Sequence, residues 1–130
     1  MKTPLVASMF LLLLLVSPAG LPAQKASVSG QKNETFAAFW LRFKTAVAAD
    51  DRAAVASMTK LPFLLEGKEL NRDGFIKRYN QLFDRKVKRC FARGKTIKDG
   101  DGFSLFCGET IFLFGKVGGE YRFLEIGVND

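Results

Sequence analysis

The 130-residue sequence contains no histidine. This absence excludes a histidine general base, the Ser-His-Asp and Cys-His nucleophilic arrangements, and most zinc sites, because each of them depends on an imidazole. Glycine-rich phosphate-binding loops are missing as well. We therefore expect no catalytic residue of these classes, no metal site and no cofactor.

Long hydrophobic runs are also absent, except at the N-terminus, where residues 5–16 form one apolar run after Lys2. The run is shorter than the roughly 20 residues that span a bilayer. Small residues follow it, which is typical of a secretory signal peptide. We expect cleavage after Ala19 or Ala23, no transmembrane segment in the mature chain, and a periplasmic or secreted protein. A retained amphipathic anchor is the alternative.

The rest of the chain predicts a single domain. Residues 1–23 are the expected signal peptide, residues 24–32 are small and polar and predict a flexible lead-in, and residues 33–130 suffice for one modest core. Phenylalanine occurs 13 times, which predicts an aromatic core. The net charge of +7 at pH 7 favours attraction to anionic partners.

Two helices are predicted at the start of the domain. One apolar face recurs at helical spacing through Phe36, Phe39, Trp40, Phe43 and Val47. Asp50 and Asp51 then cap a second, short helix, because a carboxylate accepts the free N–H groups of a helix N-terminus. Val55 and Met58 face inward in this helix, and Pro62 ends it.

A third helix is predicted to begin at Asn71. Its apolar face consists of Phe75, Ile76, Tyr79, Leu82 and Phe83. After Asp84 the apolar pattern changes from helical to alternating, which predicts strands. A short strand is expected before this helix and four strands after it: residues 61–66, then 86–94, 103–108, 109–117 and 120–128.

The sequence has two cysteines, Cys90 and Cys107, and export would place both in an oxidising compartment. We predict one disulfide between them; two free buried thiols are the alternative. If the hairpin turn is centred on residues 98–99, Cys90 lies opposite Cys107 on adjacent strands. The same register places Phe91 opposite Phe106.

A local residue pattern accompanies this order of elements. It consists of Phe39, Phe43, Ala46, Val47, Asp50, Ala54, Val55, Met58, Pro62 and Phe63, followed by Phe75, Ile76, Tyr79, Leu82 and Phe83. Over about residues 33–128 the chain thereby resembles the NTF2-like superfamily, which includes ketosteroid isomerases and SnoaL-type cyclases. The resemblance implies an α+β fold in which three N-terminal helices pack on a curled, mainly antiparallel sheet to form a cone.

Such a cone can be filled or can enclose a cavity for a small apolar ligand. The expected cavity residues are Trp40, Phe43, Tyr79, Phe83 and Phe112. The resemblance also implies a homodimer through the outer face of the sheet. Phe91, Phe106 and Phe112 are either part of that face or part of the core.

Enzymes of this superfamily use an inward acid with a tyrosine, or a His/Asp arrangement. The strand acids of this sequence are Glu66, Glu109 and Glu125, and its tyrosines are Tyr79 and Tyr121. Glu125 shares a strand face with Tyr121 and Phe123, whereas Leu124, Ile126 and Val128 form the opposite, aliphatic face. We expect the aliphatic face to be the core side, so that Glu125 points to solvent and no catalytic residue is assigned.

A basic segment is the strongest signal for a partner. Its residues are Lys77, Arg78, Arg85, Lys86, Lys88, Arg89 and Arg93, followed by Lys95 and Lys98, with Asp84 as the one acid between them. The segment predicts docking to an anionic surface: lipid head groups, an acidic glycan or an acidic protein. The alternative is a solvated basic strand edge that discourages aggregation. Nucleic acid is not expected, because the aromatic residues are predicted to be buried and the chain exported.

Together these features predict an exported, non-enzymatic binding module with a small-ligand cavity and a basic surface. The first alternative is a histidine-free enzyme of the isomerase or lyase type that uses a cone carboxylate. A cystatin-like inhibitor is disfavoured, because three helices precede the sheet and its inhibitory hairpin motif is absent.

Overall fold

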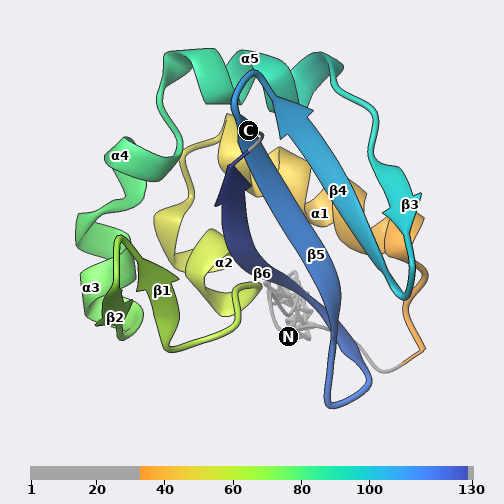
Figure 1. Cartoon of the computed structure of the whole chain (residues 1–130), viewed down its shortest axis with the longest axis horizontal. Helices are drawn as coiled ribbons and strands as arrows, with labels where there is room; N and C mark the ends of the chain where they lie inside the picture. Colours follow the sequence, from red (N-terminus) through yellow and green to blue (C-terminus); the bar gives the residue numbers. More distant parts are fainter. Residues whose placement is uncertain (1–32, 129–130) are drawn as a thin grey trace, which may run out of the picture.

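A computed structural model describes residues 33–128 of the chain. These residues form an α+β fold with five helices and two antiparallel sheets. A small two-stranded sheet lies between the second and third helices in the chain, and a four-stranded sheet follows the last helix. Figure 1 shows the helix α1 crossing behind the larger sheet and the helix α5 running along its upper end. The predicted signal peptide and lead-in lie outside the described residues.

Helix α1 (Phe36–Ala48) has the predicted apolar stripe. Phe39, Phe43 and Val47 are fully buried, and Trp40 is partly buried. The side chain of Thr35 caps the helix by accepting a hydrogen bond from the Ala38 N–H at 3.2 Å. The stripe is confirmed, because one face of the helix packs on the sheet and the other faces away from it.

Helix α2 (Arg52–Ser57) begins as predicted. The Asp51 carboxylate accepts a hydrogen bond from the Ala54 N–H at 3.1 Å and is the N-cap. Val55 and Met58 are buried, as expected. Asp50 has a different role, because its backbone adopts φ 51° and its carboxylate accepts from Lys88 Nζ at 3.0 Å.

A small hairpin follows Pro62. Its strands are β1 (Phe63–Leu65), within the predicted strand, and β2 (Lys68–Leu70), which was not predicted. Glu66 and Gly67 form the two-residue turn with φ values of 50° and 78°. Positive φ at both central residues is the geometry of a type I′ hairpin turn.

The predicted third helix is divided in two. Helix α3 (Arg72–Lys77) is capped by the Asn71 side chain, and helix α4 (Tyr79–Leu82) follows after a break at Arg78. The predicted apolar face is nevertheless on the core side: Phe75, Tyr79, Leu82 and Phe83 are buried and Ile76 packs against them.

The strand predicted for residues 86–94 is wrong, because this segment is the helix α5 (Arg85–Arg93). The Asp84 carboxylate accepts from the Val87 N–H at 2.9 Å and caps the helix. Val87 and Phe91, four residues apart, both turn toward the core. A nine-residue segment can satisfy the strand period and the helix period at once, and here the cap and the helical spacing prevail.

The larger sheet is antiparallel with the order β3-β4-β5-β6. Its strands are β3 (Ile97–Asp99), β4 (Gly102–Cys107), β5 (Thr110–Val117) and β6 (Glu120–Val128). The last three confirm the strands predicted after residue 102. Residues 58–60 run along β6, where the Phe123 N–H donates to the Met58 carbonyl and the Lys60 N–H donates to the Phe123 carbonyl, both at 2.8 Å.

A β-bulge in β6 overturns the predicted core face of that strand. Phe114 pairs with Phe123, whereas the adjacent Leu113 pairs with Glu125, so Leu124 is an extra residue. The bulge shifts the alternation of side chains. Phe123 is therefore fully buried and Leu124 is not part of the core, while Ile126 still packs on it. Glu125 is exposed as predicted.

The core is aromatic, as predicted. The Phe43 ring lies 5.3–6.2 Å, centroid to centroid, from five other rings: Phe39, Phe83, Phe91, Phe114 and Phe123. These rings come from α1, α5, the strands β5 and β6, and the segment between α4 and α5. Ring pairs at such separations add specific attraction to the effect of area burial.

Cys90 and Cys107 form the predicted disulfide, with Cα atoms 5.8 Å apart. The hairpin register that led to it is wrong. Cys90 lies on α5 and not on a strand, and β3 pairs with β4 through Ile97 and Ser104. Phe91 does not face Phe106 across a ladder, since Phe91 is buried under α5 and Phe106 is exposed. The bond therefore joins a helix to the end of a strand.

We expect the double substitution Cys90→Ser/Cys107→Ser to lower the free energy of unfolding by about 3 kcal/mol. A loop with a sequence separation of 17 would gain about this much from closure. Urea denaturation of the oxidised protein and the variant measures the difference.

A reducing agent provides the control for this prediction. It should bring the native protein to the stability of the double variant and leave the variant unchanged. Equal stability of the oxidised protein and the variant would contradict the predicted contribution of the disulfide.

Candidate functional site

The residues expected to line a cavity are packed against one another. Phe43, Phe83 and Phe112 are buried, and the Phe83 ring lies 6.2 Å from the Phe43 ring and 5.8 Å from the Phe112 ring. Tyr79 is also buried and stacks on Phe83 at 4.9 Å, while Trp40 is partly buried. The described surface hollows lie elsewhere, so a small-ligand cavity at these residues stays a prediction.

Tyr79 is the buried tyrosine of this group. Its hydroxyl donates to the Val47 carbonyl at 3.4 Å. Burial raises the pKa of Tyr79 well above its ordinary value, and the nearby Asp50 carboxylate raises it further. Tyr79 is therefore a neutral hydrogen-bond donor at physiological pH. Asp50 is exposed and paired with Lys88, so it is not a carboxylate aimed into a closed site.

The three strand acids do not form an acid–tyrosine pair. Glu66 lies exposed in the β1–β2 turn, where it accepts from the Gln81 side chain at 3.3 Å. Glu109 is exposed in the turn between β4 and β5, and Glu125 is exposed on β6. None of the three lies in the aromatic core beside Tyr79, which is the arrangement that an enzyme of the predicted alternative type needs.

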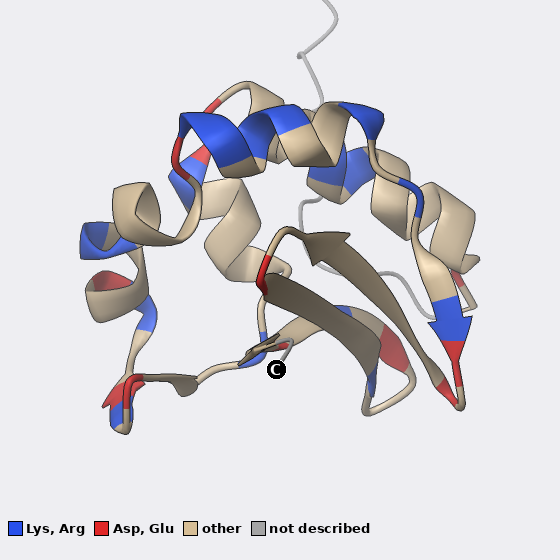
Figure 2. Cartoon of the chain, turned by 45° about the horizontal axis from the view of Figure 1, so that its top comes forward, with Lys and Arg blue, Asp and Glu red and all other residues tan. Residues whose placement is uncertain are grey.

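The predicted basic segment is divided by the fold. Helix α5 carries four exposed cations, which we call the basic stripe: Arg85, Lys86, Arg89 and Arg93. Lys88 turns to Asp50, Arg78 donates to Gln81 at 2.8 Å, and Lys77 lies on α3. Figure 2 shows the cations of α5 along one helix, with those of α3 on a separate part of the molecule.

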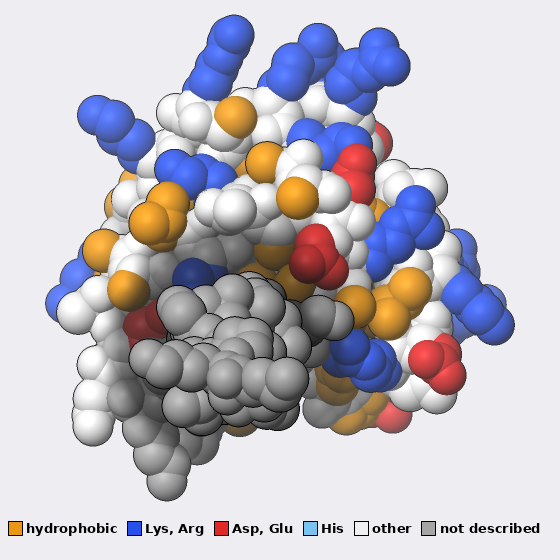
Figure 3. All heavy atoms as spheres, turned by 180° about the vertical axis from the view of Figure 1, so that it is seen from behind, with side chains coloured by type: hydrophobic (Ala, Val, Ile, Leu, Met, Phe, Trp, Pro, Cys, Tyr) orange, Lys and Arg blue, Asp and Glu red, His pale blue; other side chains and the backbone are white. Residues whose placement is uncertain are grey.

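The basic stripe follows from helical geometry. Arg85, Arg89 and Arg93 recur every four residues, and Lys86 lies one step beside them. At 3.6 residues per turn, all four fall within an arc of about 100°. Seen from behind, Lys and Arg side chains project outward from the upper edge of the molecule, where α5 lies (Figure 3). The alternation that predicted a strand would instead have spread these cations over two faces.

The opposite side of α5 is held firmly. Phe91 is buried, with its ring 5.4 Å from Trp40 and 4.9 Å from Phe112. The Cys90–Cys107 disulfide and the Lys88–Asp50 ion pair add two further links. The basic stripe is therefore presented by a helix that is fixed to α1, to the sheet and to the turn before α2.

No carboxylate pairs with the basic stripe within residues 33–128. The ion pairs found there are Arg42 with Glu34, Lys88 with Asp50 and Arg122 with Glu120. Cations three and four residues apart on a helix repel one another. The stripe is consequently a concentrated positive charge whose repulsion an anionic partner would relieve.

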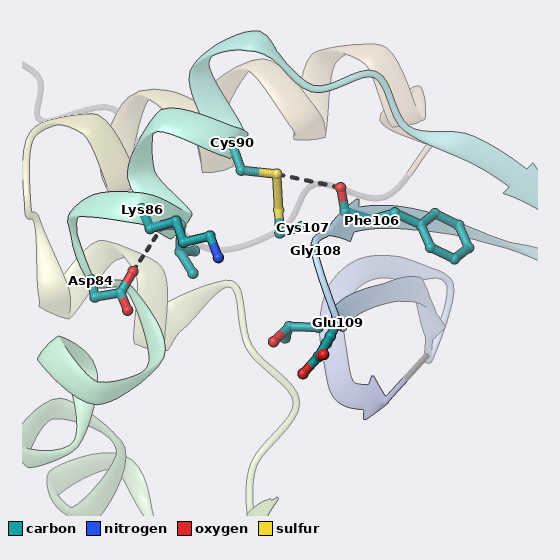
Figure 4. Close-up of a pocket in the computed structure, with 9 residues that line it drawn as sticks. Asp84, Lys86, Cys90, Phe106, Cys107, Gly108 and Glu109 are labelled. Atoms are coloured by element: carbon teal, nitrogen blue, oxygen red, sulfur yellow. Dashed lines mark hydrogen bonds between the residues drawn. A yellow bond between two sulfur atoms is a disulfide. The ribbon is translucent and has the colours of Figure 1, made fainter. Parts of the chain in front are cut away.

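A surface hollow lies between the start of α5 and the β4–β5 turn. Its lining includes Asp84, Lys86, Phe106, Cys107, Glu109 and Thr110. Figure 4 shows Lys86 and Asp84 on one side, Glu109 on the other and the disulfide above them. Sequence reasoning missed this hollow, because it brings the first turn of an unpredicted helix next to a predicted strand turn.

Comparison with known proteins finds no match among family models, curated proteins or solved structures. Among the residues described, no cluster of three or more His, Cys, Asp or Glu could hold a metal ion. None of the described helices is long and apolar enough to cross a membrane.

We expect Tyr79→Phe to become relatively more stable than the native protein as the pH rises. The raised pKa keeps Tyr79 protonated in the folded state, while the unfolded chain loses that proton above about pH 10. This difference between the folded and the unfolded pKa leaves the free energy of unfolding unchanged below the unfolded pKa and lowers it above that pKa. Thermal unfolding of both proteins from neutral to alkaline pH measures the change.

Tyr121→Phe is the matched control, since Tyr121 is only partly buried. If Tyr79→Phe and Tyr121→Phe behaved alike, the effect would not be particular to the buried Tyr79. A difference between the native protein and Tyr79→Phe that is constant across the whole range would contradict the assignment.

Proposed function

We propose that this protein is an exported, non-enzymatic interaction module that docks on an anionic partner through the basic stripe. The observation that carries the proposal is the placement of Arg85, Lys86, Arg89 and Arg93 on one exposed helical face without a described carboxylate partner. Clustered charge of one sign raises the local concentration of oppositely charged partners and speeds their association.

We also propose that the fold is an NTF2-like cone. In its support, helices cover one face of a four-stranded antiparallel sheet, and α1, α2 and the proline-containing segment precede the sheet in the order that the sequence pattern implied. The export of the protein is supported by the signal-peptide pattern and by the disulfide, which suits an oxidising compartment.

The alternative of a basic strand edge still applies to Lys98, which lies on the edge strand β3, but it does not apply to residues 85–93. A row of cations protects an exposed strand edge from pairing with other chains. Residues 85–93 are a helix with satisfied backbone hydrogen bonds, so they present no strand edge to protect. The charge of the stripe therefore calls for another explanation, and a partner of opposite charge supplies one.

The enzyme alternative has one carboxylate near a tyrosine, Asp50 near Tyr79, but Asp50 is exposed and paired with Lys88. Tyr79 is buried among rings and held neutral, and Glu66, Glu109 and Glu125 are exposed on three separate parts of the fold. Catalysis by a carboxylate and a tyrosine needs both groups within hydrogen-bond reach of one substrate. A small ligand in the cone also lacks support, because the expected lining residues contact each other.

We expect Arg85→Gln/Arg89→Gln/Arg93→Gln to elute from a heparin column at markedly lower salt than the native protein. Heparin serves as a soluble polyanion, and the triple variant removes three of the four charges of the stripe. Salt screens such contacts, so the eluting salt concentration reports their strength.

The matched control is Lys60→Gln/Lys68→Gln/Lys77→Gln, which removes three exposed cations outside α5. Both variants have the same net charge, and the control should elute close to the native protein. If both variants elute equally early, retention depends on net charge alone and the basic stripe is not the docking site.

A further inference from the structure

The outer face of the larger sheet carries apolar side chains that do not belong to the core. In β5, Phe112 and Phe114 are buried beneath the helices, so Ile111 and Leu113 point the opposite way. We call the apolar residues of this side the outer patch: Ile97, Phe106, Ile111, Leu113 and Leu124. None of them packs against the core cluster.

No described helix or strand covers the outer patch. Figure 1 shows the strands β4 and β5 in front, with α1 behind them. Ile97 is 57% exposed and Phe106 is 46% exposed. Gly127 pairs with Ile111 across the ladder, and the Leu124 side chain lies over Gly115, so these two glycines add no side chains to the face. Exposed apolar groups that lie together mark interaction sites.

The outer patch adjoins the basic stripe. Phe106, from the patch, and Lys86, from the stripe, line the same hollow. The disulfide next to Phe106 links the end of β4 to the middle of α5. It therefore fixes the position of the outer patch relative to the basic stripe. From a direction midway between the top and the front of the molecule, the cations of α5 and the outer side of β4 and β5 are seen together (Figure 2).

Deepening the function proposed above, on which this inference rests, we propose that the anionic partner is a lipid bilayer. The basic stripe contacts anionic head groups, and Phe106 with its neighbours in the outer patch enters the boundary between head groups and acyl chains. Peripheral membrane binding combines buried apolar area with attraction to anionic lipid. Each basic residue near an anionic leaflet adds to that attraction.

A bilayer fits this surface better than a soluble polyanion. An acidic glycan would contact the cations of α5 and leave the outer patch in water. A bilayer offers a charged layer and an apolar layer side by side, which matches the two parts of the surface. A second copy of the chain fits less well, because the net charge of +7 makes two copies repel one another.

Three carboxylates lie within or beside this surface. Glu125 is exposed and pairs with Leu113 on the outer face of the sheet. The other two, Asp84 and Glu109, line the hollow. Asp84 is engaged as the cap of α5, where it accepts from the Val87 N–H. Glu109 is exposed in the β4–β5 turn, on the far side of the hollow from Lys86 (Figure 4). A bilayer that contacts both the stripe and Phe106 must come close to Glu109. Removal of its charge should therefore strengthen binding to anionic lipid.

The experiment is co-sedimentation of the mature chain, purified after export, with two kinds of vesicle. One is phosphatidylcholine alone and the other is phosphatidylcholine mixed with phosphatidylglycerol. We expect binding to the mixed vesicles only, falling with added salt. Every variant shares the same N-terminal residues, so their contribution cancels in each comparison.

Three variants, each with a matched control, locate the contact. Arg85→Gln/Arg89→Gln/Arg93→Gln should weaken binding on the order of 100-fold, and the Lys60/Lys68/Lys77 triple variant should not. Phe106→Ala should weaken it about fivefold, whereas Leu41→Ala, at a 61% exposed apolar residue on α1, should have no effect. Glu109→Gln should tighten it about fivefold, and Glu69→Gln on β2 should have no effect.

Phe106→Trp is the control for a loss of binding caused by misfolding. It retains an aromatic residue at the membrane interface, so the affinity for vesicles should be kept or raised.

Heparin retention without vesicle binding would overturn the lipid inference and leave the proposed function standing. Absence of both would overturn both. Equal effects of Phe106→Ala and Leu41→Ala, or light scattering that shows a dimer broken by Phe106→Ala, would also overturn the inference, the latter because a second copy then covers the patch.

Discussion

Phe43 lies where the helices meet the sheet, and its ring lies close to rings from α1, α5, β5, β6 and the segment that leads into α5. Phe39 belongs to the same helix, Phe83 and Phe91 come from the segment that leads into α5 and from α5 itself, and Phe114 and Phe123 come from the sheet. A domain of this size buries only about two-thirds of the surface that its unfolded chain exposes. Large aromatic side chains that share contacts are an efficient way to fix several elements with few residues.

The position of α5 depends on this cluster. Phe91 inserts between Trp40, Phe43 and Phe112, so the inner face of the helix is set by the core. The disulfide then fixes the helix against the end of β4. With the apolar side committed inward, the remaining arc of a nine-residue helix must face solvent, and the sequence places four cations on it. The charged surface is thus a direct consequence of how the core is packed.

Much of the fold could be predicted from periodicity and capping. The long stripe of α1, the Asp51 cap and the strands after residue 102 have strong local signals. Residues 86–94 lack such a strong local signal, because their short apolar pattern suits a strand as well as a helix. Only Asp84, which caps the helix, distinguishes the two. The disulfide was predicted correctly from the wrong geometry, since two cysteines in an oxidised chain have a single pairing.

The candidate site was predictable in composition and unpredictable in shape. The cations were evident as a cluster, but their gathering on one side requires the helix α5. The separation of Lys77 and Arg78 from them requires the break at Arg78 and the break between α4 and α5 at residues 83–84. The bulge at Leu124 has a similar effect on the sheet. It reverses the alternation of side chains in β6, a change that depends on pairing with β5 and has no local signal.

The linkage between α5 and β4 has a further consequence for recognition. Cations on a helix that repel one another would favour fraying if the helix were free. Here Phe91, the Asp84 cap and the disulfide oppose that tendency, so stability gained in the core offsets repulsion on the surface. The same linkage holds the basic stripe and Phe106 at a fixed separation. A partner that contacts both meets a surface that is already in place. This protein therefore loses little conformational entropy when the partner binds.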